Sequence, residues 1–451
     1  MKDKYTLTVG LEIHAELNTR TKMFCDSKND PDETRPNVNV CPVCMGHPGT
    51  LPVINKEAVR SVLRLGVALG GEIADYTEFD RKNYFYPDIP KGYQISQYKY
   101  PLVKGGELCG VRLTRIHLEE DTARSSHDKG DDSLLDFNRA GVPLMELVTE
   151  PVIHDPETAG SFAKELQLTL NHLNIAEANM EKGEMRVEAN ISVGVGDKLG
   201  TKVEVKNLNS FKAVEKAIKF EMERQVSLLE AGEKVVQETR GWDENRGETF
   251  SQRVKEDSHD YRYFPDPDLP KLFINEIEGF SEKELKASLP ELPQEKRERY
   301  SKNFGLKETD IEIYVRSPEW GTLLEETATL LKEPELVQLA SNYIVSDLKS
   351  PITAKSLADV VNMIKVGEIS SRGAKDILKV IQEKGGEAKT IAEENNLIQE
   401  SDREVLKKIV DEVRKENTGD VPVQFLVGQA MKKSGGRANP IILQELFKEE
   451  S

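Results

Sequence analysis

The segment Tyr5-Thr-Leu-Thr-Val-Gly-Leu-Glu12-Ile-His14-Ala-Glu16-Leu17 alternates apolar and polar residues. Side chains two residues apart in a strand point to the same side, so Glu12, His14 and Glu16 share one face while the intervening aliphatic residues can face a core. Two carboxylates and an imidazole on one face predict the floor of a cation or phosphate site. A strand with a merely solvated polar face is the alternative from this segment alone.

Composition limits the classes of protein that this chain can be. It has 451 residues, 37% of them hydrophobic and 31% charged, with a net charge of −17. That length is enough for about three domains. No apolar run approaches the ~20 residues that span a bilayer, and no signal peptide opens the chain, so we expect a cytoplasmic protein without a membrane partner. Four cysteines argue against a disulfide framework. The net negative charge does not exclude a nucleic-acid-binding protein, because phosphate binding depends on local clusters of lysine and arginine.

Up to about residue 290 the chain has the pattern of short strands, turns and scattered helices. The alternating segments Met185–Val193 and Lys202–Lys206 predict a hairpin with one charged face. Helical periodicity covers 155–175 and 210–232, and Ser210 is a suitable N-cap. Neither GxxxxGK[ST] nor GxGxxG is present, so the predicted fold class is α+β without a P-loop or Rossmann nucleotide site.

The two prolines of Leu289–Arg297 mark a change in composition, after which helices dominate. Helices are predicted over residues 319–332, 335–348, 356–365, 370–383, 402–416 and 421–433. We therefore expect an α+β domain with an antiparallel sheet at 1–292, an all-α helical domain at 293–400 and a small helical tail domain at 401–451.

Further polar segments add to the predicted site. They are His117-Leu-Glu119-Glu120-Asp121, Asp136 to Glu146 with Arg139 inside it, Phe79 to Gln94, and the hairpin residues Glu188, Lys206 and Asn209. Carboxylates with an imidazole and several cations indicate Mg²⁺ holding phosphate oxygens, with lysine and arginine offsetting charge on a transferred phosphoryl group. Separate surface or structural roles for these acids are the alternative.

Three of the cysteines could belong to a metal site. Cys41-Pro-Val-Cys44 has the form of a zinc knuckle, and Cys25 lies upstream at a suitable distance. A closed zinc site needs a fourth ligand, and position 27 is Ser27. Ordinary reduced thiols are the alternative to zinc.

The C-terminal segment Gln429–Asn439 combines a helix end, flexible glycines and three cations, Lys432, Lys433 and Arg437. Contact with the RNA backbone is one use of such a segment. A solvated helix end whose cations interact favourably with the helix dipole is the alternative.

Several separated motifs occur in order along the chain: Val9–Leu17, Arg81–Asp88, Lys91–Gln97, His117–Asp121, Asn138–Glu146, Glu204–Phe211 and His259–Leu269. In these motifs, and over essentially its whole length, the chain resembles the family of aspartyl/glutamyl-tRNA amidotransferase B subunits of the bacterial type. The resemblance implies a catalytic fold like that of glutamine synthetase, an antiparallel-sheet cradle. It also implies an ATP- and magnesium-dependent ligase, of enzyme class 6, that phosphorylates the side-chain carboxylate of Glu-tRNA(Gln) or Asp-tRNA(Asn). Ammonia then replaces the phosphate.

The resemblance further implies a heterotrimer. In it, ammonia is released from glutamine by a separate amidase (glutaminase) subunit, and the complex is held together by a small third subunit. Carried over to this sequence, the family's magnesium site falls on His14, Glu120 and Glu146, with Glu12 close by. Lys82 and Lys91 match basic positions near the ammonia outlet. Many relatives hold zinc with Cys-x-Cys followed by Cys-x-x-Cys, and Ser27 breaks that pattern.

Beside this carry-over, Arg139, Glu188 and Lys206 are our own candidates for contacts to ATP or to the activated carboxylate, and Lys432, Lys433 and Arg437 for contacts to tRNA. Two other functions compete: a tRNA-binding scaffold without chemistry, and a free-standing amide ligase acting on a small acid. Glu12, His14, Glu120 and Glu146 are all present, and a scaffold without chemistry would not need them. The helical C-terminal half with its basic end fits a tRNA substrate better than a small acid.

Overall fold

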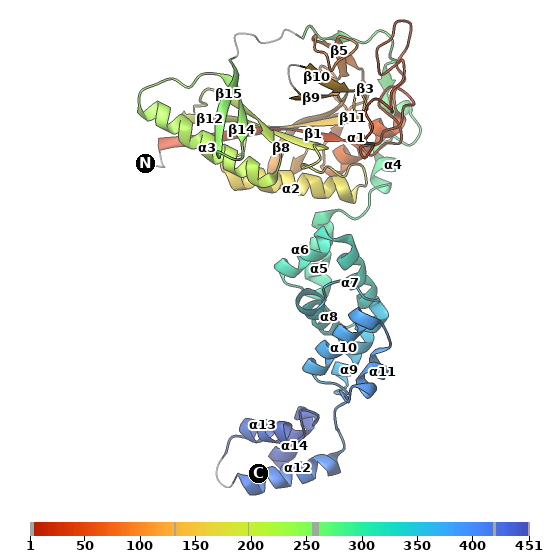
Figure 1. Cartoon of the computed structure of the whole chain (residues 1–451), viewed down its shortest axis with the longest axis vertical. Helices are drawn as coiled ribbons and strands as arrows, with labels where there is room; N and C mark the ends of the chain where they lie inside the picture. The colour runs from red at the N-terminus through yellow and green to blue at the C-terminus, as the bar shows by residue number, and fades with distance from the viewer. Residues whose placement is uncertain (1–3, 130–131, 197, 255–260, 418–420, 450–451) are drawn as a thin grey trace. The chain divides into compact units, whose positions relative to one another are not determined.

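The computed structural model describes residues 4–129, 132–196, 198–254, 261–417 and 421–449 (Figure 1). His259 and Asp260 of the last family motif lie outside these residues. The chain divides into two compact units, Met1–Leu292 and Pro293–Ser451. The first contains strands and helices and the second contains helices, which confirms the α+β class. The likeness to glutamine synthetase stays a prediction.

A sheet with β1 (Tyr5–Glu16) at its centre forms the base of the first unit. Its strands follow the order β15-β14-β13-β12-β1-β11-β8-β6-β2, and β7 pairs with β8. β1 runs antiparallel to both of its neighbours, β11 and β12, and the predicted hairpin is confirmed as the pair β12–β13. The other strands are β2 (Glu72–Ile73), β6 (Val103–Lys104), β7 (Glu107–Leu108), β8 (Val111–Glu120), β11 (Pro143–Thr149), β12 (Met185–Val195), β13 (Val203–Leu208), β14 (Glu238–Asp243) and β15 (Glu248–Val254).

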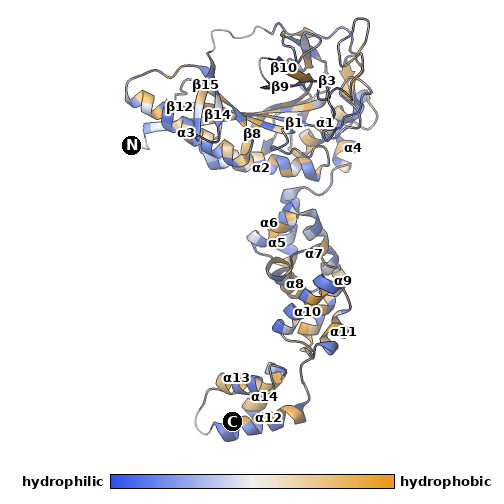
Figure 2. Ribbon diagram, in the orientation of Figure 1, coloured by the Kyte–Doolittle hydropathy of each residue, from blue (hydrophilic) through white to orange (hydrophobic). Residues whose placement is uncertain are grey.

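Three helices cover one face of this sheet: α1 (Lys56–Ala68), α2 (Pro156–His172) and α3 (Phe211–Glu230). Each begins at a residue whose side chain accepts backbone N–H groups, and the predicted cap Ser210 is confirmed at the start of α3. Val9, Leu11 and Ile13 of β1 are almost fully buried in the core beneath. Figure 2 shows α2 and α3 with both hydrophobic and hydrophilic residues, as expected of helices that cover a sheet.

Smaller elements complete the first unit. Figure 1 shows β5 and the hairpin β9–β10 on the side of the sheet away from α2 and α3. The polar residues of β1 lie on this side of the sheet, opposite to the aliphatic residues that face the core. The smaller elements are β3 (Tyr76–Thr77), β4 (Asp80–Asn83), β5 (Tyr93–Ser96), β9 (Arg124–Lys129), β10 (Asp132–Asp136), β16 (Phe264–Pro265), β17 (Leu272–Phe273), the 3-10 helix η3 (Ile274–Glu276) and α4 (Glu282–Ala287).

A buried ion network joins α3 to the edge of the sheet. Glu221 has no exposed surface, and its carboxylate accepts hydrogen bonds from Arg224, Gln225 and Thr249. Arg240 Nε lies 3.6 Å from the same carboxylate. We expect Glu221→Gln to lower the free energy of unfolding by about 2 kcal/mol, because it leaves buried arginine charge with less compensation. Denaturant titration of the full chain measures this. A change below about 0.5 kcal/mol, the usual size for a surface substitution, would contradict it.

The second unit consists of helices, and each helix predicted in this region is confirmed. They are α5 (Pro293–Phe304), α6 (Glu308–Arg316), α7 (Pro318–Leu331), α8 (Pro334–Asp347), α9 (Ala354–Lys365), α10 (Ser371–Lys384), α11 (Ala388–Glu394), α12 (Arg403–Glu416), α13 (Val423–Lys433) and α14 (Pro440–Glu449). The last three share a core of their own, around Leu406, Val410, Leu443 and Phe447. Within the described residues, no helix is both long and apolar enough to cross a membrane.

Candidate functional site

Three adjacent strands bring acids and imidazoles together on the face of the sheet away from α2 and α3. His14 of β1 lies opposite Glu146 of β11, and Glu146 lies opposite His117 of β8. Strand alternation adds Glu12 and Glu119 to the same face. We call Glu12, His14, His117, Glu119 and Glu146 the acid cluster. The β1 members are more than a hundred residues from those on β8 and β11, so the sheet register creates the cluster.

The distances within the acid cluster are short. His14 Nε2 lies 3.5 Å from Glu146 Oε2 and 3.6 Å from Glu119 Oε1. His117 Nε2 lies 3.3 Å from Glu146 Oε2. Glu146 thus stands between two imidazoles and is itself buried. The sequence prediction that His14 and Glu146 share a site agrees with this geometry.

The pKa shifts show that the acid cluster is short of positive charge. Burial and the charges of Glu146 and Glu188 raise the pKa of Glu12 to about 7. Burial opposes protonation of His14, but Glu146, Glu119 and Glu188 outweigh it and raise its pKa to about 9. Burial also disfavours the Glu146 charge, yet the imidazoles of His117 and His14 hold its pKa well below the usual value. A divalent cation would supply the missing charge.

The donor atoms fit such a cation. Ligand atoms of Glu12, His14 and Glu146 all lie within 4.8 Å of one another, and the same holds for His117, Glu119 and Glu146. Within the described part of the chain, buried Glu119 Oε2 has no hydrogen-bond partner. Carboxylate oxygens are the ligands that Mg²⁺ prefers, and it keeps several waters, so a few carboxylates suffice. The residues present therefore fit Mg²⁺.

Glu120, the third predicted magnesium ligand, lies elsewhere. Its carboxylate accepts hydrogen bonds from Lys91 Nζ at 2.7 Å and from the backbone N–H of Ile95 at 2.9 Å. Glu119 is two residues from His117, so its side chain lies on the same face of β8. It is therefore Glu119, and not Glu120, that lies next to His14. The structure brings together two of the three predicted ligands and puts Glu119 in the place of Glu120. Strand alternation places Glu119 on the same face as His117, but that this face meets His14 follows only from the register of the three strands.

Cations border the acid cluster on two sides. Lys206 Nζ lies 2.9 Å from Glu188 Oε2, so these two candidates are brought together on β12 and β13. Arg115 Nη2 lies 3.5 Å from Glu146 Oε1. Lys82 Nζ lies 5.0 Å from the centre of the Tyr261 ring. Burial opposes the charge on Lys82, but Glu119, Tyr263 and Glu146 raise its pKa above the usual value. Arg115 was not singled out from the sequence.

Asp121 gathers two arginines at one end of the same face. Its Oδ2 lies 2.7 Å from Arg186 Nη2 and 3.3 Å from Arg139 Nε. Burial and the neighbouring Asp121 charge raise the pKa of Glu16 to about 8. Glu16 and Arg139 also line a cavity of about 460 Å³ with acids and bases around it. The candidate Arg139 is thus joined to the acid face through Asp121, a contact between segments that the sequence does not predict.

The three candidate zinc ligands also come together. The Sγ atoms of Cys25, Cys41 and Cys44 lie within 4.8 Å of one another, and we call these residues the thiol cluster. Ser27 Oγ lies 3.8 Å from Cys44 Sγ, and buried Lys22 Nζ lies 3.7 Å from it. A structural zinc ion takes four ligands in a tetrahedron. Here a hydroxyl and an amine stand where a fourth ligand would be, so the described residues do not fit a structural zinc ion.

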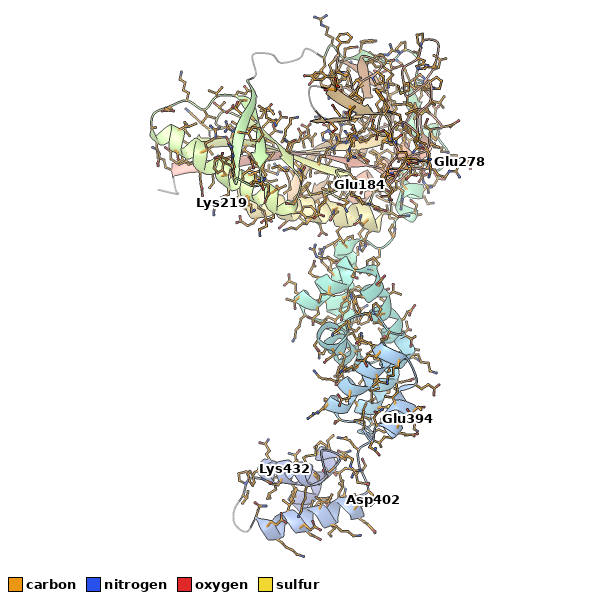
Figure 3. All side chains as sticks on the ribbon, viewed as in Figure 1. Glu184, Lys219, Glu278, Glu394, Asp402 and Lys432 are labelled. Atoms are coloured by element: carbon orange, nitrogen blue, oxygen red, sulfur yellow. The ribbon has the colours of Figure 1, made fainter. Side chains whose placement is uncertain are left out.

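The cations of the tail differ in their surroundings. Lys433 pairs with Glu412 at 3.0 Å and with Glu416 at 2.7 Å, so part of its charge is already matched within the tail. Lys432 on α13 is exposed (Figure 3). Arg437, which follows α13, is also exposed. Contact of these residues with tRNA stays a prediction.

Comparison with known proteins identifies the relatives of this chain. The family model described as the GatB/GatE catalytic domain matches residues 7–278, and the GatB domain matches residues 326–450. A protein of Crocosphaera subtropica is 40% identical over 489 residues, covering 99% of this chain and 97% of the relative. One of Thermodesulfovibrio yellowstonii is 41% identical over 475 residues, covering 98% of each. One of Brevibacillus brevis is 40% identical over 479 residues, covering 99% and 98%. All three are named as the B subunit of aspartyl/glutamyl-tRNA(Asn/Gln) amidotransferase.

Proposed function

This chain belongs to the family of aspartyl/glutamyl-tRNA(Asn/Gln) amidotransferase B subunits, and from this premise we propose that its sheet activates the substrate carboxylate with ATP and Mg²⁺. Members of the family are subunits of a ligase that amidates misacylated tRNA, together with other subunits. The substrates that we propose are Glu-tRNA(Gln) and Asp-tRNA(Asn). The proposed partners are an amidase and a small third subunit, and the proposed location is the cytoplasm.

The observation that carries this proposal is the convergence of Glu12, His14, Glu119 and Glu146 on one face of the sheet. A tRNA-binding scaffold has no physical use for several buried carboxylates around imidazoles, because burying like charges opposes folding. A magnesium-dependent phosphoryl transfer does, because its metal ion must be held by oxygen ligands beside the reacting groups.

These four residues would hold Mg²⁺. When bound, the ion draws together phosphate oxygens and offsets their charge. His14 must give up its Nε2 proton to become a ligand, because Nε2 is the ring nitrogen that lies 3.5 Å from Glu146 and 3.6 Å from Glu119. Glu12, with a pKa raised to about 7, becomes fully ionised once the cation is present.

The cations around the acid cluster have a separate task. A carboxylate is a poor acyl donor, and phosphorylation converts one of its oxygens into a leaving group that ammonia can displace. Lys206 and Lys82 would offset the negative charge of the phosphoryl group during this transfer. Arg139, held by Asp121 beside the 460 Å³ cavity, would orient the carboxylate of the aminoacyl end. Lys91 is held against Glu120, next to Glu119, and we keep it as the candidate at the ammonia outlet.

The test is ATP consumption by the reconstituted complex with and without misacylated tRNA. We expect misacylated tRNA to raise the rate about tenfold or more, because binding energy from the tRNA is used to align the reacting carboxylate. The uncharged tRNA is the matched control and should not stimulate. A rate that is indifferent to tRNA would favour a free-standing ligase, and no ATP consumption under any condition would favour a scaffold.

A further inference from the structure

The sulfur of Cys44 is surrounded by hydrogen-bond donors. The backbone N–H of Cys41 donates to Cys44 Sγ at 3.1 Å, and Lys22 Nζ donates to it at 3.7 Å. As a thiol, Cys44 also donates to the Cys41 carbonyl at 3.4 Å, a hydrogen bond that the thiolate gives up. Ser27 Oγ lies 3.8 Å from Cys44 Sγ, and the thiol of Cys25 is a further neighbour. Several donors directed at one sulfur stabilise the thiolate form, which is the reactive form of cysteine. Three neighbours accordingly lower the pKa of Cys44, although burial opposes them. They are the hydrogen bond from Cys25, the backbone N–H of Cys41 and the charge of Lys22.

Lys22 supplies the charge that a metal ion would bring in a four-cysteine site. Its side chain has no exposed surface, and Nζ also donates to the Phe137 carbonyl at 3.0 Å. Burial lowers the pKa of Lys22 and the neighbouring Cys44 opposes this shift, so a Cys44 thiolate and a Lys22 ammonium would form a neutral buried pair without zinc. A zinc ion bound here would have to tolerate that ammonium beside one of only three thiolates.

The thiol cluster is reachable. Cys25 and Cys44 both line a cavity of about 120 Å³, which is large enough for a molecule of the size of hydrogen peroxide. Cys25 stands within 4.8 Å of Cys44, sulfur to sulfur, so a small movement brings the two to bonding distance.

We propose that Cys44 and Cys25 form a zinc-free pair that a hydroperoxide oxidises to a disulfide, and that this oxidation acts on Lys91. The Cys44 thiolate attacks one peroxide oxygen, which breaks the O–O bond and gives a sulfenic acid and hydroxide. The Cys25 thiol then attacks the Cys44 sulfur, the S–S bond forms and the sulfenic oxygen leaves as water. A cellular thiol such as glutathione reverses the change by thiol–disulfide exchange.

The link to Lys91 is a direct packing contact. The turn that follows Cys44 contains Gly46, with a positive φ of 66°, and an added Cβ there would lie 2.8 Å from Lys91 Cγ and 3.2 Å from Lys91 Cα. Lys91 in turn pairs with Glu120, the neighbour of Glu119 in the acid cluster. Drawing Cys44 toward Cys25 therefore shifts the turn that holds Lys91 in place.

The first test measures zinc and disulfide in the full chain purified within its complex. We expect wild type to contain much less than one zinc per chain, and Ser27→Cys, which restores a fourth thiol, to contain about one. Stoichiometric zinc that chelators do not remove from wild type would overturn the proposal.

The second test treats the complex with hydrogen peroxide and maps disulfides by peptide mass spectrometry. All variants carry Cys109→Ser, because Cys109 is exposed and lies outside the thiol cluster, and this background itself is the matched control. We expect a Cys25–Cys44 bond in the background, none in Cys25→Ser, and formation about tenfold slower in Lys22→Met, which lacks a donor to the thiolate. Oxidation that leaves Cys44 a free thiol, or joins Cys41 instead, would overturn the pairing.

The effect on Lys91 rests on the proposed function and has its own readout. We expect the disulfide to lower glutamine-dependent amidation about threefold or more, since ~1 Å shifts of supporting groups can cost that much. Dithiothreitol should restore the rate, and Cys25→Ser should not respond to peroxide. Unchanged amidation in fully disulfide-bonded complex would overturn the link to Lys91. Absence of amidation in the reduced complex would instead count against the proposed function.

Discussion

Replacing Glu146 with glutamine is expected to lower tRNA amidation by about a thousandfold, equivalent to ~4 kcal/mol of transition-state stabilisation. Glu146 lies 3.5 Å from His14 and 3.3 Å from His117. Among the described residues, it belongs both to the candidate ligand group Glu12, His14 and Glu146 and to the group His117, Glu119 and Glu146. Glutamine keeps the shape of the side chain but removes the charge that holds the cation and orients both rings. The measurement is single-turnover amidation with saturating ATP and with ammonium in place of glutamine, which makes the result independent of the amidase.

The chain should stay folded after this substitution, but at a cost in stability. The imidazoles of His117 and His14 hold the pKa of Glu146 well below its usual value, so its charge stabilises the folded state, and relief of its repulsion with Glu12 offsets only part of that loss. A cooperative thermal transition below that of wild type but above the assay temperature, together with lost amidation, is the expected pair of results. The matched control is Glu150→Gln. Glu150 follows β11 directly, is half-buried and accepts a hydrogen bond from Thr114. The free energy of unfolding of this control should stay within about 0.5 kcal/mol of wild type. Amidation within tenfold of wild type in Glu146→Gln would remove Glu146 from the chemistry.

The parts of the fold with strong local patterns could be predicted from the sequence. The two-residue period of β1 sufficed to place Glu12 and His14 on one face, and the serine cap and apolar period of α3 sufficed to place that helix. These are local properties of the chain, set by backbone geometry and by which side chains must be buried. The same holds for the helices after Pro293.

The contacts between distant segments could not be predicted. Whether Glu119 or Glu120 meets His14 depends on which face of β8 is covered, and this is fixed by the register of β8 against β11. The pairing of Asp121 with Arg186 likewise depends on four strands, β12, β1, β11 and β8, being in place. In the thiol cluster, Ser27 was visible in the sequence, but the approach of Lys22 to Cys44 depends on how two loops fold over one another.

Asp121→Asn should lower the free energy of unfolding of the first unit by about 3 kcal/mol at pH 7. The Asp121 carboxylate is buried and faces Arg186 and Arg139, and the arginines keep the carboxylate pKa below its usual value although burial opposes them. About 3 kcal/mol is the lower end of what breaking a buried pair costs, because both arginines are roughly one third exposed. A carboxyl with a depressed folded-state pKa contributes stability above its unfolded pKa and loses it in acid. The difference from wild type should therefore shrink as the pH falls below about 4.

The measurement is denaturant titration of the full chain in a Trp320→Phe background, which leaves Trp242 as the reporter of the first unit. Asp155→Asn is the matched control, because asparagine replaces aspartate well as the N-cap of α2. A loss below about 1 kcal/mol, or one that grows in acid, would show that Asp121 does not hold the arginines.

The double variant Asp121→Asn/Glu16→Gln should lose more stability than the two single variants together. With Asp121 present, Glu16 has a pKa of about 8 and is mostly protonated at pH 7, so glutamine mimics it at little cost. Without Asp121, the main charge that opposes its ionisation is gone, and Glu16 can ionise and take over the pairing with Arg139 and Arg186. Glu16→Gln then removes the remaining carboxylate. We expect a coupling of about 1 kcal/mol or more, whereas additivity within about 0.4 kcal/mol would mean that Glu16 and Asp121 do not share the two arginines.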